Sequence, residues 1–394
     1  MLQTIVVYLS LLFLITILFT KKFKINGVLL SNNIFSIKNA PFIIAILLFS
    51  IIIGMRYGVG VDHLTYLEDY VQYQQEGKYW AFYHLELGFG LISKLFADLG
   101  FHYWVYFTFW SFLQTFFLFY AIKRNQEAAL PFLAITFILG GTVLSFMNGI
   151  RQQLAFCIFV FSIEFIKNHK PIKYYILIFL ASLFHFSALL LLPIYPLFRY
   201  RKKPYFNRIW LQFILLGISF FLLYQNYIEK IFFGLSKIAN IFGYERYIDI
   251  LSEGNEHLLF SLTRSRGIGF YIIVLLNIIL IANSNKLKDY FSNGYFSKIY
   301  DLYFFGVIYG YICNGSIILL RPNYYFGGFT FIIAAFALLF FFMNLKESRN
   351  NILFFITMLC IYLLIFVALI YRMDDNTFRY VFFWQEHLHY LKHD

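Results

Sequence analysis

The spacing of the apolar residues constrains this fold more than any other feature of the chain. They fall into blocks of roughly 17 to 25 residues, the length that a helix needs to cross a hydrocarbon core of about 30 Å. Lipid offers no hydrogen-bond partners, and a helix satisfies its own backbone groups. The sequence therefore predicts an all-α, polytopic integral membrane protein.

Composition and charge exclude a water-soluble globule and a nucleic-acid-binding protein. Of the 394 residues, 61% are hydrophobic and only 13% are charged, which leaves too little polar surface to cover a globule. The net charge of +12 comes from short basic clusters between apolar blocks, and no continuous basic face emerges. Cys157, Cys313 and Cys360 lie in apolar stretches without a paired spacing, which favours core packing over disulfides or zinc.

We predict about ten membrane-spanning helices and one or two further membrane segments. The first apolar block lacks a basic start and a small-residue cleavage site, so we expect it to be retained as a span. The segments 86–100 and 174–198 fit the topology better as re-entrant or amphipathic helices. The expected spans are 2–20, 41–55, 103–122, 129–146, 150–166, 209–224, 267–283, 300–320, 324–343 and 351–371.

The charges of the loops orient the chain in the membrane. Six loops on one predicted side hold 19 of the 32 Lys and Arg residues but only three acids. Cytoplasmic loops carry an excess of Lys and Arg, so this side faces the cytoplasm and both termini lie outside. These loops are 21–39, 123–128, 167–173, 199–208, 284–298 and 345–350.

The segment 174–198 has basic residues on both flanks, Lys170 and Lys173 before it and a cluster from Arg199 after it. Both flanks are therefore expected on the cytoplasmic side. The segment should enter the membrane and return, with its turn near residues 184–186. A single long tilted span is the alternative.

A single transmembrane domain is expected over residues 1–394, with large outer loops at 56–86 and 225–266. Both loops mix aromatic side chains with both charge signs. Such loops suit sugar binding, and ordinary interfacial helices explain them equally well.

Three arginines at the outer ends of predicted helices are candidate anion-binding residues: Arg56, Arg151 and Arg321. Guanidinium groups stay charged and bind phosphate oxygens in a fork, so converging arginines suit a diphosphate better than a neutral sugar. The alternative is that each arginine anchors a helix end among lipid headgroups.

Polar neighbours of these arginines are candidate substrate-binding residues. On a continuous helix Asn148, Arg151, Gln152 and Ala155 share one face, which would then look into a cavity. Phenols stand close to the other two arginines in the sequence. The four candidates for contacts with substrate are Gln152, Tyr66, Tyr324 and Tyr325.

Two side chains are candidates for the general base. Asp62 follows Arg56 in a glycine-containing loop, where it could also be the structural partner of that arginine. His185 stands in an apolar setting that favours the neutral ring, which can accept a hydroxyl proton. A histidine hydrogen-bonded inside the helix bundle is the plainer alternative.

Four strings in order and in register resemble those of the EpsG-like family of Wzy-type polysaccharide polymerases. They are RYGVGVDHLTY at 56–66, NGIRQQLA at 148–155, SLFHFSALLLLPIY at 182–195 and RPNYYF at 321–326. Val61 and His63 differ from the Thr and the aromatic residue expected in the first string. The resemblance covers most of the chain.

The resemblance implies a membrane glycosyltransferase that polymerises O-antigen, capsule or exopolysaccharide repeat units at the outer face of the bacterial cytoplasmic (inner) membrane. The growing chain would leave undecaprenyl diphosphate for a hydroxyl of the next lipid-linked unit. Arg151 and Arg321, with Arg56 in support, would stabilise the departing diphosphate, and His185 or Asp62 would deprotonate the acceptor. A chain-length regulator protein is a further candidate partner, beside the lipid-linked oligosaccharide and membrane lipid.

No Asp-x-Asp string lies near these residues, so we expect neither a metal nor another cofactor. An O-antigen ligase-like enzyme is the nearest alternative, because only its acceptor differs. A transporter or flippase for lipid-linked sugars would need a similar cationic cavity, but it predicts paired symmetric halves, which the sequence does not display. A membrane O-acyltransferase and a non-enzymatic scaffold are weaker alternatives.

Overall fold

The structure, a computed structural model, describes residues 1–20, 39–60, 62–76, 86–201, 204–224, 267–313, 320–371 and 378–385. Within these ranges every regular element is a helix, and one isolated bridge joins the extended backbone at Arg56 and Phe382. The all-α prediction is confirmed for this part of the chain. The predicted outer loop 225–266 and residues 77–85 of the other outer loop lie outside it.

The described helices belong to two compact units. Unit 1 comprises Met1–Arg201 and Ala334–Asp394, and unit 2 comprises Lys202–Ile333. Before Arg201 the helices are α1 (Leu2–Thr20), α2 (Ala40–Gly54), α3 (His63–Glu76), α5 (Leu87–Asp98), α6 (Tyr103–Gln126), η3 (Glu127–Ala129), α7 (Leu130–Leu139), α8 (Thr142–Asn148), α9 (Ile150–Lys167), α10 (Pro171–Ser182), η4 (Phe186–Leu191) and α11 (Ile194–Arg199). After it come α12 (Ile209–Tyr224), α16 (Ile268–Ala282), α17 (Ser284–Tyr290), α18 (Tyr295–Ile312), η6 (Arg321–Tyr324), α20 (Phe329–Met343), α21 (Arg349–Tyr371) and η8 (Phe383–Gln385).

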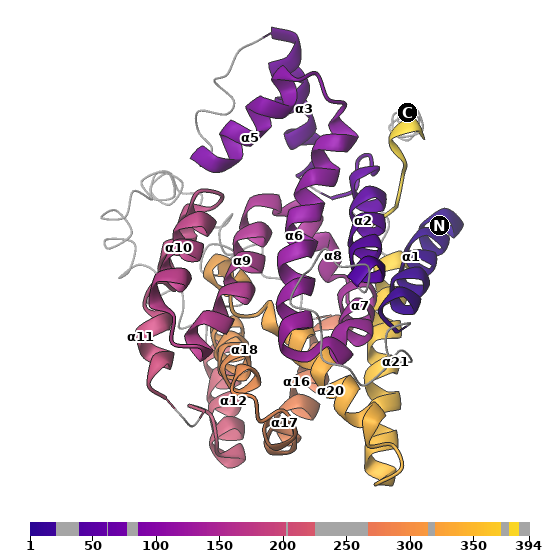
Figure 1. Cartoon of the computed structure of the whole chain (residues 1–394). Coiled ribbons are helices and arrows are strands. Elements are labelled where there is room, and N and C mark those ends of the chain that lie inside the picture. The colour runs from indigo at the N-terminus through magenta and orange to yellow at the C-terminus, as the bar shows by residue number, and fades with distance from the viewer. Residues whose placement is uncertain are drawn as a thin grey trace. The chain divides into compact units, whose positions relative to one another are not determined.

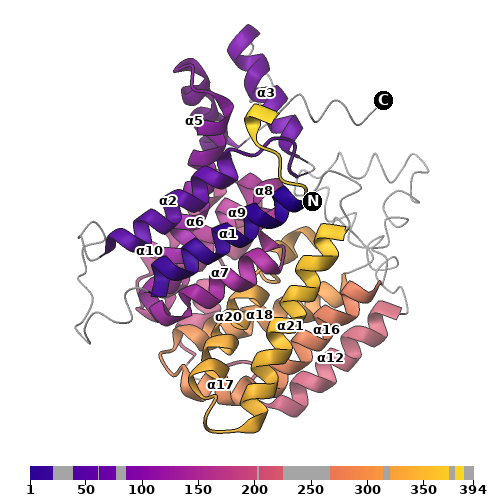
Figure 2. The same cartoon turned by 90° about the vertical axis from the view of Figure 1, so that its right-hand side faces the viewer.

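Unit 1 is a bundle whose helices pack side by side (Figures 1 and 2). α2 packs on α6, α6 on α9 and α9 on α10, while α1 packs on both α2 and α7. The buried side chains of α1 recur every three or four residues, for example Tyr8, Leu11 and Ile15. Its other side is apolar too, and Phe13 is 66% exposed there. A helix with one buried face and an apolar outer face is suited to a lipid environment.

The two ends of unit 1 differ in charge. At one end Lys123 of α6 donates to the residue before α2 at 2.7 Å, and Arg124 pairs with Glu164 of α9 at 2.6 Å. The opposite end gathers the ends of α2 and α8, because Arg56, which follows α2, donates through Nη2 to Met147 O of α8 at 3.1 Å. Lys123 and Arg124 thus lie at the end of unit 1 opposite Arg56, as predicted, whereas residues 21–38 lie outside the described ranges and 284–298 belong to unit 2. Which side is the cytoplasm stays a prediction.

Residues 174–198 form a hairpin, as predicted, and the single long span is excluded. α10 ends before a turn at His185, and η4 and α11 return along α10. Tyr174 Oη donates to Leu191 O at 2.6 Å, and the rings of Tyr174 and Tyr195 lie 5.4 Å apart. The two basic flanks of the hairpin therefore lie at the same end of unit 1.

The segment predicted at 86–100 is the amphipathic helix α5. Its buried face includes Phe89 and Ser93, whereas Leu91 and Leu95 are more than half exposed on the other face. α5 packs on α3, and both lie at the end of unit 1 that is opposite the basic loops (Figure 1). Whether α5 enters the membrane stays a prediction.

One predicted span is not a single helix. The stretch 129–146 contains α7 and α8, and the chain turns between them at Gly140 and Gly141. Gly141 has a φ of 69°, in the left-handed region that favours glycine. A Cβ atom at Gly140 would lie 2.8 Å from the ring of Tyr362 on α21. The close approach of α21 and the left-handed turn break the helix, and the apolar pattern carries no sign of either.

Helix length and apolarity indicate a multi-pass membrane protein, while the count of ten spans stays a prediction. Four stretches qualify as spans, and the bent pair α16 and α17 is a fifth if the two helices, which meet at 55°, form one span. Among the described residues the four stretches that are long and apolar enough to cross a membrane are Leu2–Thr20, Tyr103–Leu139, Arg321–Met343 and Arg349–Tyr371. Several other predicted spans are helices that are shorter than this, as α2 and α12 are.

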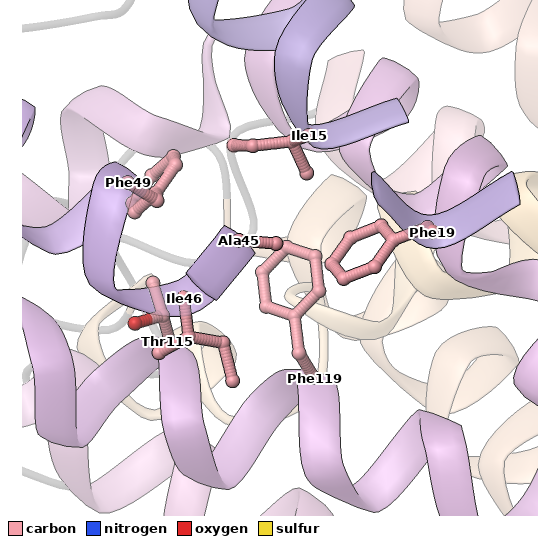
Figure 3. A pocket seen from close by; sticks show the side chains of 7 residues that line it. All are labelled: Ile15, Phe19, Ala45, Ile46, Phe49, Thr115 and Phe119. Carbon is pink, nitrogen blue, oxygen red and sulfur yellow. The ribbon is translucent and has the colours of Figure 1, made fainter. Parts of the chain in front are cut away.

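An apolar gap with no room for a water molecule lies among α1, α2 and α6 (Figure 3). Its lining contains one hydroxyl, that of Thr115, and no ionisable group. The lining residues are Ile15, Phe19, Ala45, Ile46, Phe49, Thr115 and Phe119. We interpret it as a packing gap in the helix bundle and give it no chemical role.

In unit 2 a buried polar network holds the segment before α12 against α18. Asp301 of α18 accepts the backbone N–H of Tyr205 at 2.8 Å and that of Phe206 at 3.2 Å. Lys288 Nζ donates to Phe206 O at 2.5 Å. These bonds satisfy a carboxylate that is 3% exposed, so we assign the network to folding.

Candidate active site

Three segments that are far apart in the sequence converge at the end of unit 1 opposite the basic loops. They are the residue before α5, the first turn of α9 and the turn after α10. Each supplies one ionisable side chain, and we call Glu86, Arg151 and His185 the Glu86 cluster. The side chains are 17%, 25% and 27% exposed, so the cluster is shielded but reachable from solvent.

Helix ends hold all three side chains. Glu86 is the residue before α5, with an extended backbone at φ −60° and ψ 142°. His185 is likewise extended, at φ −155° and ψ 111°, and separates α10 from η4. Arg151 is the second residue of α9. All three residues therefore lie where the ends of α5, α9 and α10 come together.

Glu86 uses both carboxylate oxygens within the cluster. Arg151 Nη1 donates to Oε2 at 2.5 Å. The other oxygen, Oε1, lies 2.9 Å from His185 Nδ1 and accepts the backbone N–H of Phe186 at 3.3 Å. One carboxylate therefore joins an arginine and a histidine from different helices.

The electrostatics of the cluster determine the state of Glu86. Burial disfavours its charge, but the hydrogen bond from His185 and the charge of Arg151 outweigh burial and lower the pKa of Glu86 from 4.5 to about 2. An ionised carboxylate only accepts hydrogen bonds, so the proton between the two groups belongs to His185 Nδ1. In the neutral ring the lone pair then sits on Nε2.

α5 is locked against the turn after α10. The N–H of Gly88 donates to Leu183 O at 2.8 Å. A Cβ atom at Gly88 would lie 2.9 Å from both the Cβ and the carbonyl oxygen of Leu183, so no larger residue fits without movement. This contact holds Glu86 beside His185.

Arg151 has further neighbours on α5 and α3. Its guanidinium carbon lies 5.7 Å from the centre of the Phe89 ring, a cation–π contact. Its Nε donates to Tyr66 Oη at 3.5 Å. Burial raises the pKa of Tyr66, so this phenol stays protonated at neutral pH. The structure thus brings Tyr66, Arg151 and His185 together, and their predicted roles stay predictions.

Arg56 has a different environment. It is 2% exposed and donates to the backbone carbonyls of Ile53, Val59 and Met147 at 2.8, 3.3 and 3.1 Å. Its neighbours in the chain pair with the C-terminal segment, because Tyr57 N–H donates to Val381 O at 2.8 Å. Arg56 therefore joins three stretches of backbone, and we leave it out of the Glu86 cluster.

The expected polar face on one helix does not form. Gly149 has φ −86° and ψ 57°, which is not helical, so α8 ends at Asn148 and α9 begins at Ile150. Asn148 is thus on a different helix from Arg151, and Ala155 is fully buried. The prediction of a single face was wrong because the helix breaks at this glycine. Gln152 follows Arg151 in the first turn of α9.

Asp62 lies in the loop between α2 and α3 and is exposed. Its backbone carbonyl accepts the N–H of Tyr66 at 3.1 Å, which places it one turn before Tyr66. The loop requires glycine at Gly60, whose φ is 100° and whose added Cβ would lie 2.2 Å from Asn148 Oδ1. The role of Asp62 as a base stays a prediction.

The other three predicted site residues belong to unit 2, namely Arg321, Tyr324 and Tyr325. Arg321 begins η6 and is exposed, Tyr324 is 46% exposed and Tyr325 is fully buried. η6 packs on α18. Their predicted roles toward substrate stay predictions.

Comparison with known proteins identifies the family. The family model described as EpsG family matches residues 39–382, which is most of the chain. The chain belongs to the EpsG family. Together with the apolar helices, this membership indicates a multi-pass membrane protein related to polysaccharide biosynthesis. No curated protein and no solved structure matches this EpsG-family protein.

The matched range of the EpsG family includes all three members of the Glu86 cluster. Within the described residues, no group of three His, Cys, Asp or Glu side chains is arranged to hold a metal ion. The prediction that the protein needs no metal stays a prediction.

Sequence reasoning missed Glu86. The predicted site contained cations able to bind a diphosphate but not the carboxylate that pairs with them. A signal was present, because Glu86 is the only acid between Glu76 and Asp98 and directly precedes an apolar stretch. An ionisable residue at such a boundary is a functional candidate on the same grounds as Arg151.

Proposed function

We propose that this protein is an oligosaccharide repeat-unit polymerase. It transfers a growing glycan from undecaprenyl diphosphate to the next lipid-linked repeat unit, at the outer face of the bacterial cytoplasmic membrane. One observation carries the proposal: an arginine suited to a diphosphate and a histidine suited to a hydroxyl meet at one carboxylate. Glycosyl transfer from a lipid diphosphate needs those two functions within reach of each other.

Arg151 acts on the donor in this proposal. The bond between the anomeric carbon and the diphosphate oxygen breaks, and the diphosphate leaves with the electron pair. A planar guanidinium binds two oxygens of that anion and stabilises the charge as it develops. Partial burial strengthens the interaction, because Arg151 is 25% exposed and Phe89 covers one face of its guanidinium.

His185 acts on the acceptor. Nδ1 donates its proton to Glu86, so Nε2 of the neutral ring takes the proton of the attacking hydroxyl. The hydroxyl oxygen forms the new bond to the anomeric carbon as that proton leaves. The products are the lengthened glycan on its lipid and free undecaprenyl diphosphate, which completes the exchange.

Other predicted residues keep supporting roles in the proposal. Tyr66 holds Arg151 and is near enough to contact the donor, while Gln152 follows Arg151 in the same turn. Arg321 is proposed as a second diphosphate-binding residue and Tyr324 as a contact to substrate, whereas Tyr325 is fully buried and would have to become exposed to take the same role. These three unit 2 residues and Asp62 rest on the family resemblance.

Reconstituted protein tests the proposal. Wild type in liposomes receives an undecaprenyl-diphosphate-linked repeat unit from its own host, and the products are separated on a gel. We expect a ladder from wild type and a loss of about 100-fold or more in rate for Arg151→Lys, because Lys keeps the charge but loses the fork. Arg321→Lys tests the second arginine in the same way.

Arg124→Lys is the matched control, since Arg124 also pairs with a glutamate but at the opposite end of unit 1. Its ladder should equal that of wild type. A single transfer onto a different acceptor would indicate a ligase. Movement of labelled substrate across the bilayer without any ladder would overturn the polymerase proposal in favour of a transporter.

A further inference from the structure

The Glu86 carboxylate occupies the place that a diphosphate would take on Arg151. Its Oε2 accepts a hydrogen bond from Arg151 Nη1 at 2.5 Å. The same guanidinium group would donate to a phosphate oxygen. The guanidinium of Arg151 is therefore already paired with a protein carboxylate.

The same carboxylate orients His185. Oε1 receives the Nδ1 proton at 2.9 Å and the Phe186 N–H at 3.3 Å, so the ring and the turn that carries it are held by one oxygen. A carboxylate bound to one imidazole nitrogen determines which nitrogen has the lone pair and where it points. Here it leaves Nε2 as the accepting atom.

We propose that Glu86 is the positioning residue of the site, orienting His185 through one oxygen and occupying Arg151 through the other until a diphosphate displaces it. This inference rests on the proposed function. It goes further by making donor binding and acceptor activation depend on one side chain. When the diphosphate takes Arg151, Glu86 keeps only His185, and its full charge then supports the imidazolium that forms as the acceptor loses its proton.

The prediction separates binding from rate. Glu86→Gln keeps the size and hydrogen-bonding shape of the side chain but removes the charge that competes for Arg151. Diphosphate binding should therefore improve while catalysis declines. A residue that served only to hold the fold would instead weaken both when changed.

The first measurement is the binding of inorganic pyrophosphate to the full chain in detergent, by calorimetry. Glu86→Gln should bind at least about fivefold more tightly than wild type, since a competing ion pair is lost. The matched control is Asp98→Asn, which also changes a carboxylate into an amide. Asp98 is the last residue of α5 and pairs with Lys94 at 3.2 Å. The control variant should bind pyrophosphate as wild type does.

The second measurement is steady-state polymerisation. Glu86→Gln should lower kcat by about 30-fold or more without raising the KM of the lipid-linked donor, because the base loses its carboxylate. Unchanged kcat, or a raised KM with weaker pyrophosphate binding, would overturn the positioning role. If Glu86→Gln does not fold, Glu86→Met decides, because it keeps the length of the side chain but has no carboxylate, and it should show the same opposite changes.

Failure of the proposed function is distinguishable. If wild type forms no polymer, the polymerase proposal fails, while the pyrophosphate comparison still decides whether Glu86 competes for Arg151. Equal pyrophosphate affinity in wild type and both Glu86 variants would overturn the inference even if wild type polymerises.

Discussion

Arg56 and Arg151 lie at the same end of unit 1, and sequence alone treats them alike. Arg56 is 2% exposed and donates to three neutral carbonyls. Arg151 is 25% exposed and pairs with an ionised carboxylate that is itself shared with a histidine. Carbonyls buried by the fold cannot be exchanged for a ligand without unfolding, whereas a carboxylate can be displaced by a stronger anion. Partner chemistry thus predicts a structural role for Arg56 and a binding role for Arg151.

Replacing the two arginines should give opposite results, and this is the largest effect that we expect. Arg56→Met leaves three carbonyls without their donor and should lower the free energy of unfolding by about 3 kcal/mol. Arg151→Met should cost only about 1 kcal/mol but abolish polymerisation. Unfolding temperature in detergent and activity per folded molecule measure the two quantities. Full stability with lost activity in Arg56→Met would place Arg56 in the chemistry after all.

The loop that carries Arg56 depends on Gly60. Gly60→Ala should destabilise the protein by about 1–3 kcal/mol, because its φ is 100° and the new Cβ would lie 2.2 Å from Asn148 Oδ1. Gly100→Ala is the matched control, with a φ of 69° and no atom within 4 Å of the added Cβ. Thermal unfolding compares them. Equal losses would mean that backbone strain, and not the contact with Asn148, determines the cost.

Acid should weaken the Glu86 cluster and leave the surroundings of Arg56 intact. Because folding lowers the pKa of Glu86 from 4.5 to about 2, its contribution is present above about pH 4.5 and is lost as the pH falls toward 2. We expect a loss on the order of 1 kcal/mol after screening by solvent, relative to Glu86→Gln over the same range. Unfolding temperatures at several pH values measure it. Parallel curves for the two proteins would contradict the shift.

The pair Lys94–Asp98 on α5 should matter least, although Asp98 also accepts from Tyr73 Oη of α3 at 2.8 Å. Its nitrogen and oxygen are 3.2 Å apart, but the side chains are 43% and 49% exposed. Solvent and salt screen such a pair, so Lys94→Ala should change the unfolding temperature by only about 1 °C. A larger fall would mean that α5 depends on this pair to hold Glu86 in place.

Local patterns were sufficient for much of the fold. Apolar blocks predicted the helices, and the basic flanks of 174–198 predicted the turn at His185 that the structure contains. The turn was predictable because charge constrains both ends of a segment independently of its packing. The break at Gly140 and Gly141 was not predicted, since glycine is common within membrane helices, and the close approach of α21 to both glycines is a tertiary contact.

The candidate site, like the fold, was predictable only in part. Arg151 and His185 were identified from the cost of placing ionisable groups in apolar surroundings, which depends on the residue and its neighbours in the sequence. Their meeting at Glu86 involves segments that are 65 and 99 residues away from it. No local pattern encodes such a distance.

By itself the sequence determined that this chain is helical and apolar and predicted its orientation from the loop charges, because those properties follow from hydropathy and charge counted along the chain. Tertiary structure decided which arginine has a partner that a ligand could replace. That depends on whether the fold surrounds the guanidinium with backbone carbonyls, as at Arg56, or with one carboxylate from another helix end, as at Arg151.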